Sequence, residues 1–344
     1  MKAFWNPLQL THTPAFFLMR GEVRANFEVP ARAVALLEAC HSMGLEITTP
    51  ADISRDLLQT VHPAAYLDFL EHGFQAWAAL GDAGPEMVAN VHPSPEMLAN
   101  GAVMPPHITG QTGWFTADTS CPIGQYTWAA ASAAAGGAIA AAEEAAAGRS
   151  AYALARPPGH HTYAARAGGH CYLNNAALAV ELLLARGAKR VAVLDIDSHH
   201  GNGTQGIFYD RADVLFVSVH GDPNRYYPWF TGHAGELGNA AGIGFNLNLP
   251  LPFGTGDAGW LAAMAAGMTK IDRFHPDALV VSLGFDASKD EPLNALSVTE
   301  EGFARAGTMI GAAKLPTAIV QEGGYNVDVL GTLLTRFLAG FGAP

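Results

Sequence analysis

The sequence predicts an α/β protein built on one parallel β-sheet with helices on both faces. Short apolar segments recur along the chain without the alternation of a half-exposed strand, which is typical of strands buried on both faces. Segments with a helical pattern separate them, and this order is characteristic of βαβ units. Because such crossovers are right-handed, the helices are expected on both faces of the sheet.

Five strands and three helices carry this prediction. The expected strands are residues 152–154, 191–194, 214–219, 278–283 and 317–320. The expected helices are residues 173–186, 257–274 and 299–313. An Ala-rich segment, residues 129–148, is interrupted as an apolar span by Gly136, Gly137, Glu143 and Glu144. We interpret it as a helix packed closely against its neighbours.

A polar segment follows each expected strand. In open α/β sheets, binding sites form beyond the carboxyl ends of the strands. Five polar segments in this position therefore predict one shared site. They are residues 156–161, 195–204, 218–222, 284–286 and 321–325.

The chain has 344 residues, of which 49% are apolar, which allows one large domain or two small ones. No repeat or low-complexity linker divides it, so a single domain over residues 1–344 is expected. Residues from about 81 to 126 are rich in Pro, Gly, Asn, His and Met. A loop of this length is usually functional or an assembly element.

Charge and cysteine content exclude several classes of protein. The chain carries 19 basic and 31 acidic residues, a net charge of −12, which disfavours nucleic acid as a partner. Its three cysteines (Cys40, Cys121 and Cys171) are scattered and form no disulfide framework, as in a reducing compartment. The N-terminus lacks a signal-peptide pattern, and no long apolar span is present. We expect a cytoplasmic protein with no membrane partner.

Asp197, His199 and Asp286 are the predicted metal ligands. Asp197 and His199 are two residues apart after one strand, so their side chains point the same way, and Asp286 follows another strand. Two carboxylates and an imidazole suit Zn²⁺, and Fe²⁺ suits them also. Three protein ligands leave a position open for water and substrate.

His160 and His161 are predicted to be catalytic. The preceding Pro-Pro-Gly fixes the backbone that carries these two imidazoles, and His is the usual general base near neutral pH. Asp195 and Asn202 are candidate partners, and a carboxylate and an amide would make the two imidazoles titrate differently. Other histidines, among them His12 and His62, are expected in loops or on the surface.

Tyr325 follows two glycines, of which Gly324 allows an unusual backbone and a close approach to a ligand. A phenol at this position can donate to a developing oxyanion. Gly169, His170 and Gly324 are expected to line the substrate channel. Cys171 beside them is expected to be buried packing rather than a nucleophile.

Together these segments resemble the histone deacetylase superfamily of zinc amidohydrolases, and most of all its bacterial acetylpolyamine amidohydrolases. The matching motifs are RPPGHH at 156–161, CYLNNA at 171–176, DIDSHHGNGT at 195–204, GFD at 284–286 and EGGY at 322–325. The resemblance implies an arginase/deacetylase fold with a central eight-stranded parallel sheet.

The resemblance also implies a set of ions. Zinc would lie on Asp197, His199 and Asp286. Two structural sites for K⁺ or Na⁺ are implied as well. The first involves Asp195, Asp197, His199, Ser218 and Val219, and the second the backbone oxygens of Phe208, Arg211 and Val214.

Pairings and assembly follow from the resemblance in the same way. His160 would pair with Asp195, and His161 with Asn202. Tyr227 would form the channel wall opposite His170. The insertion at about 81–126 would narrow the channel mouth and make a homodimer.

The implied activity is hydrolysis of an N-acyl amide, here N-acetyl, on a primary amine such as an acetylpolyamine or a related small acylated amine. Deacetylation of acetyl-lysine in peptides or proteins, or hydrolysis of another small amide, are the alternatives. Polyamine amidases carry acidic residues in the insertion, but the corresponding residues 107–112 contain none, and Ser120 stands at another such position. Glu291 stands where the family usually has Asp.

Two other classes of function remain open from the residues. An arginase-like enzyme with two metals would need a further charged ligand, and Asn202 occupies a natural place for one without supplying charge. A silent binder of acylated amines would have lost a ligand, a catalytic His or the Tyr, and the sequence retains all of them.

Overall fold

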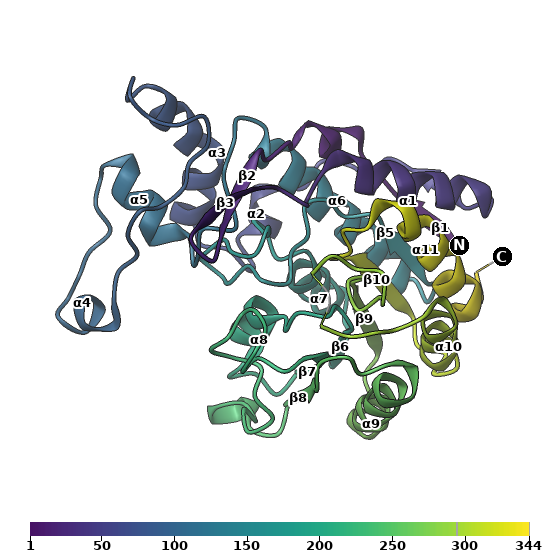
Figure 1. Cartoon of the computed structure of the whole chain (residues 1–344). Helices are drawn as coiled ribbons and strands as arrows, with labels where there is room; N and C mark the ends of the chain where they lie inside the picture. Colours follow the sequence, from purple (N-terminus) through teal and green to yellow (C-terminus); the bar gives the residue numbers. More distant parts are fainter. Residues whose placement is uncertain (294, 344) are drawn as a thin grey trace.

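The computed structural model describes residues 1–293 and 295–343. Its centre is an eight-stranded sheet in the order β4-β1-β5-β10-β9-β6-β7-β8, and every neighbouring pair is parallel (Figure 1). The strands are β1 (Lys2–Phe4), β4 (Glu46–Thr48), β5 (Ala151–Ala153), β6 (Val191–Asp195), β7 (Val214–Gly221), β8 (Asn246–Leu251), β9 (Ala278–Leu283) and β10 (Thr317–Gln321). The predicted α/β fold is confirmed.

Five of these strands were expected, and β1, β4 and β8 were not. β1 and β4 have only three residues each, too few to give a pattern. β8 alternates buried with half-buried residues at first and contains Pro250, as an edge strand does. It lies at one end of the sheet.

Helices cover both faces, so the protein has three layers. Alternate residues of one strand belong to different cores: Val280 of β9 packs in the cluster with α6 and α7, and Val281 in the cluster with α9, α10 and α11. The helices are α1 (Pro30–Ser42), α2 (Arg55–Leu58), α3 (Ala64–Ala78), α4 (Pro95–Ala99), α5 (Ile108–Phe115), α6 (Thr127–Ala146), α7 (Asn175–Ala185), α8 (Asn202–Phe208), α9 (Asp257–Phe274), α10 (Glu300–Gly311) and α11 (Val327–Phe341). Asn174 and Thr299 cap α7 and α10, which shortens the predicted helices slightly. No helix of the described residues is both long and apolar enough to cross a membrane.

Two features project from these layers. An antiparallel hairpin is formed by β2 (Phe16–Met19) and β3 (Glu22–Ala25). The expected insertion holds α4 and α5, and Figure 1 shows the segment with α4 extending away from the sheet and its covering helices.

A buried ionic cluster joins the N-terminal segment to the loop after β10. Glu28 is fully buried, and its Oε1 lies 2.6 Å from Arg32 Nη1 and 2.9 Å from Arg156 Nε. Arg32 also donates to the carbonyl oxygens of Glu322, at 2.6 Å, and Gly324, at 2.5 Å. One buried carboxylate thus balances two guanidinium groups and fixes a loop near the end of the chain.

His62 and His12 lie outside helices and strands, as expected, but both are buried rather than on the surface. His62 is fully buried; its Nδ1 lies 2.8 Å from Ala164 O, and Asn174 N donates to its Nε2 at 3.0 Å. Both contacts suit a neutral ring with the proton on Nδ1. Burial lowers the pKa of His62 to about 4.

We expect Glu28→Gln to lower the free energy of unfolding by about 3–5 kcal/mol, because it leaves two buried guanidinium groups without a countercharge. Urea unfolding measures the change. Glu38→Gln is the matched control, since Glu38 is an exposed residue of α1. Equal stability of the two variants would contradict a stabilising role for the cluster.

His62 should also make stability depend on pH. Its pKa is about 4 in the folded state, below the usual histidine value of about 6.5, so the unfolded chain binds more protons between these values. Stability from this residue is present above pH 6.5 and declines as the pH falls towards 4. Between pH 7 and pH 5 the loss is about 2 kcal/mol. His62→Asn should lose this share of the pH dependence in urea unfolding, and His72→Asn, at an exposed position, should keep it.

Candidate active site and metal centre

The site is built first on β6 and the loop after it. β6 ends at Asp195, whose Oδ1 accepts a hydrogen bond from the backbone N of Asp197 at 3.1 Å. Asp197 Oδ1 accepts in turn from the backbone N of His199 at 2.9 Å. Each carboxylate therefore fixes the residue two positions later, and the loop presents its polar side chains in a set order.

Gly201 in this loop is required for space rather than for its backbone conformation. Its φ is −75°, a value that other residues adopt readily. A Cβ at this position would lie 2.1 Å from Asp195 Oδ2, well inside van der Waals contact. Any larger residue would displace the carboxylate.

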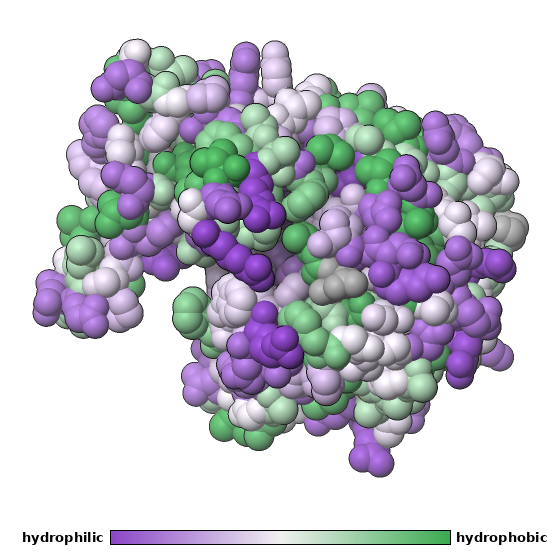
Figure 2. Space-filling model, viewed as in Figure 1, coloured by the Kyte–Doolittle hydropathy of each residue, from purple (hydrophilic) through white to green (hydrophobic). Residues whose placement is uncertain are grey.

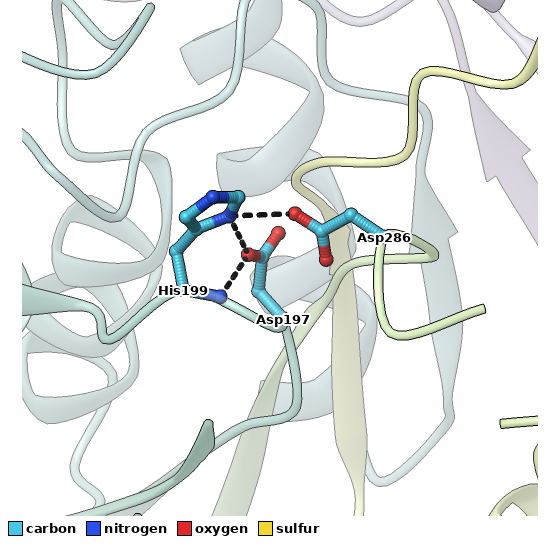
Figure 3. A group of neighbouring side chains, drawn as sticks. All are labelled: Asp197, His199 and Asp286. Carbon is cyan, nitrogen blue, oxygen red and sulfur yellow. Dashed lines mark hydrogen bonds and ion pairs between the residues drawn. The ribbon is translucent and has the colours of Figure 1, made fainter. Parts of the chain in front are cut away.

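The three predicted metal ligands converge. His199 Nδ1 lies 2.8 Å from Asp286 Oδ2 and 3.2 Å from Asp197 Oδ1, and one donor atom from each residue lies within 4.8 Å of the others (Figure 3). The other oxygen of each carboxylate accepts a hydrogen bond from a backbone N–H group. Gly323 N donates to Asp197, and Ser198 N donates to Asp286. The backbone thus orients both carboxylates.

The donor set fits a divalent cation. All three residues are buried, and two carboxylates side by side without a cation would be costly. Burial alone would lower the pKa of His199, but the charges of Asp286 and Asp197 outweigh it and raise this pKa to about 9. The site therefore favours positive charge, and oxygen and nitrogen donors suit zinc or iron(II).

His160 and His161 lie together beside this cluster, with ring centroids 4.0 Å apart. His160 Nδ1 is 2.9 Å from Asp195 Oδ2, which is the expected pairing. Burial opposes a charge on this ring, but Asp195, Asp197 and Glu322 outweigh it and raise the pKa of His160 well above its usual value. Asp195 therefore favours the charged form of His160.

His161 has the other expected partner, because its Nδ1 lies 2.6 Å from Asn202 Oδ1. An amide oxygen can only accept, so Nδ1 carries the proton and Nε2 is left as an acceptor. Burial, together with the charges of His160 and His199, lowers the pKa of His161 well below its usual value. The pKa values of these two adjacent imidazoles are thus shifted in opposite directions.

Tyr325 lies after Gly324, whose φ of +113° requires glycine, as the sequence predicted for this turn. The Glu291 carboxylate accepts a hydrogen bond from the backbone N of Tyr325 at 3.0 Å, which holds the loop after β10 in place. Burial raises the pKa of the Tyr325 phenol well above its usual value, so the phenol keeps its proton and remains a donor. Arg32 Cζ lies 4.9 Å from the centre of its ring.

Three of the four expected channel residues line one cavity of about 550 Å³, and Gly324 is not among its lining residues. Gly169, His170 and Tyr227 surround it together with His161, His199 and Tyr325. Asp118, from the insertion, supports this wall: it accepts from Tyr227 Oη at 2.6 Å and from Gly169 N at 3.2 Å. Burial lowers the pKa of His170 to about 4, so the ring is neutral.

Sequence reasoning missed Tyr226. Its ring stacks on His199 with centroids 4.2 Å apart, and its Oη donates to Leu293 O at 2.7 Å. No motif marks it, since it lies in an irregular loop after β7. Its neighbour Tyr227 was identified only through the family resemblance.

The residues expected at the monovalent-ion sites lie within β7, at the ends of β6 and α8 and in the loops that follow those two elements. Ser218 is paired in register with Asp195 on the neighbouring strand. Phe208 ends α8, and its carbonyl oxygen accepts from Arg211 N at 3.0 Å, shortly before Val214 begins β7. Cys171 is fully buried, and burial raises the pKa of its thiol well above the usual value, as for an inert packing residue.

Comparison with known proteins identifies relatives across the whole chain. Residues 26–341 match the family model described as histone deacetylase domain. The acetylpolyamine amidohydrolase of Burkholderia pseudomallei is 44% identical, and the match covers 100% of this chain and 99% of the relative. Acetylpolyamine amidohydrolase 1 of Pseudomonas aeruginosa is 43% identical, over 94% of each chain.

A solved structure agrees with these relatives. The crystal structure of an acetylpolyamine aminohydrolase from Burkholderia pseudomallei superimposes with a TM-score of 0.94 at 43% identity, covering 100% of this chain and 99% of that one. The chain therefore belongs to the histone deacetylase domain family and is a hydrolase of the deacetylase type.

Proposed function

We propose that the chain hydrolyses the N-acetyl amide of a small primary amine, using a metal held by Asp197, His199 and Asp286. The observation that carries this proposal is the pair of adjacent buried imidazoles with unlike partners, Asp195 and Asn202, next to the cluster of metal-type ligands. Amide hydrolysis needs a group that accepts a proton from water and later returns it to the leaving amine.

The ligand set would hold Zn²⁺ or Fe²⁺. Such an ion polarises the acyl carbonyl and lowers the pKa of water. The implied K⁺ or Na⁺ sites near Ser218 and Phe208 would support the loops after β6 and α8. They are structural in this proposal and take no part in proton transfer.

The two histidines divide the proton transfer. His161 is neutral, and its free Nε2 accepts the proton of the attacking water and then delivers it to the leaving nitrogen. His160, held charged by Asp195, contributes positive potential beside the reacting carbonyl. Tyr325 keeps its proton and donates it in a hydrogen bond to the developing oxyanion.

The shape of the site favours a slim acylated amine. The cavity is about 550 Å³, and its walls include Tyr226, Tyr227 and Phe253. The relatives named as acetylpolyamine amidohydrolases support a small substrate over acetyl-lysine in a folded protein. A homodimer through the insertion and a cytoplasmic location belong to the same proposal.

We expect Tyr325→Phe to lower kcat by about a hundredfold or more, because one oxyanion donor contributes about 2.7–4 kcal/mol. Turnover of an acetylated primary amine, with metal content measured on the same sample, checks this. Tyr126→Phe is the control, since Tyr126 is exposed and outside the cavity. Undiminished turnover would remove Tyr325 from the mechanism.

We expect Asp286→Ala to abolish stoichiometric binding of the divalent metal, because it removes one of three ligands. Elemental analysis after dialysis should give about one ion per wild-type chain and far less for the variant. Asp272→Asn, at an exposed position of α9, should bind as the wild type does. Two divalent ions per wild-type chain would favour an arginase-like centre, and a fully loaded protein without turnover would favour a silent binder.

A further inference from the structure

The cavity over the catalytic residues has a cationic rim. Three arginines line this cavity, and each carries a full positive charge: Arg20, Arg24 and Arg225. Among the described residues, no Asp or Glu lines this cavity. The rim is formed by hairpin β2–β3 and by the loop after β7.

Two of these guanidinium groups are available to a ligand. Arg24 Nη2 lies 2.8 Å from Glu22 Oε2, so its charge is partly offset. Arg20 and Arg225 are exposed and make no ion pair with another described residue. Arg225 Cζ lies 4.7 Å from the centre of the Phe253 ring, which holds the guanidinium at the edge of the cavity. In the wall, Asp118 already accepts hydrogen bonds from Tyr227 and Gly169.

The sign of this rim is opposite to that of the whole protein, which carries a net charge of −12. Figure 2 shows strongly hydrophilic side chains gathered around the hollow at the centre of this face. Between the rim and the catalytic residues the lining is largely apolar or aromatic. These lining residues include Phe17, Leu18, Met19, Tyr226, Phe253, Pro292 and Leu293. The site therefore offers an apolar passage with positive charge at its outer end.

Resting on the proposed function, we propose that the enzyme selects N-acyl amines whose far end carries an anion, such as N-acyl-ω-amino acids. The carboxylate of such a substrate would meet Arg20 and Arg225 while its methylene chain lies along the apolar lining. Guanidinium groups bind carboxylates through paired charge-assisted hydrogen bonds. The same groups repel the ammonium end of an acylated diamine.

Three substrates with the same number of methylene groups test this charge selection. They are 6-acetamidohexanoate, N-hexylacetamide and N-acetylcadaverine, which end in a carboxylate, a methyl and an ammonium group. For the metal-loaded wild type in low salt, kcat/KM should be about tenfold or more higher for the anion than for the cation. The difference should shrink in 0.5 M NaCl, because salt screens charges at exposed positions.

Variants at the rim test which residues select the charge. In Arg20→Gln/Arg225→Gln, the ratio of kcat/KM for the anionic over the neutral substrate should fall about tenfold or more. Arg273→Gln/Arg305→Gln is the matched control, because it removes two exposed arginines from α9 and α10 and changes the net charge equally. Glu22→Gln releases Arg24 and should raise the same ratio.

The outcomes separate this inference from the proposed function. No hydrolysis of any of the three amides by metal-loaded enzyme would refute amide hydrolysis itself. Hydrolysis of the neutral amide with equal or better use of the cationic one would overturn the anion selection alone. An equal fall of the ratio in the control variant would assign the effect to net charge rather than to the rim.

Discussion

The burial of three carboxylates at the ends of adjacent strands is the constraint on which the rest of the site depends. Asp195 and Asp197 follow β6, and Asp286 follows the neighbouring β9. Like charges this close are unstable without compensation. Backbone N–H groups and the imidazoles of His160 and His199 provide part of this compensation, and the divalent cation of the proposed function would supply the rest. Once these groups are in place, the opposite pKa shifts of His160 and His161 follow from their positions.

The sequence predicted the strands and the site segments whose structure depends on residues close together in the chain. The five strands expected from the sequence are continuous apolar segments, and the polar segments after them meet because parallel strands end at one edge of the sheet. The predicted metal ligands Asp197 and His199 lie two residues apart in one loop, and Asp286 follows the neighbouring strand β9. Family resemblance added the pairing of each histidine with its partner, which spacing alone left open.

The parts that it did not predict depend on contacts between distant segments. Tyr226 stacks on His199 only because an irregular loop folds over the site. Asp118 lies in the insertion and supports the cavity wall by accepting a hydrogen bond from Tyr227, which is far from it along the chain. His62 is buried because it forms hydrogen bonds with Ala164 and Asn174, which lie more than a hundred residues later in the chain. Short strands such as β1 gave too few residues for a pattern.

The position of β10 has a consequence for synthesis of the chain. It is the last strand to be made, yet it lies between β5 and β9 and hydrogen-bonds to both. Before it emerges from the ribosome, the half-sheets β4-β1-β5 and β9-β6-β7-β8 each have an apolar edge with unpaired backbone groups. Such edges promote aggregation during folding. Nascent chains that stop before β10 therefore need protection, and the loop carrying Tyr325 completes the enzyme only at the end of translation.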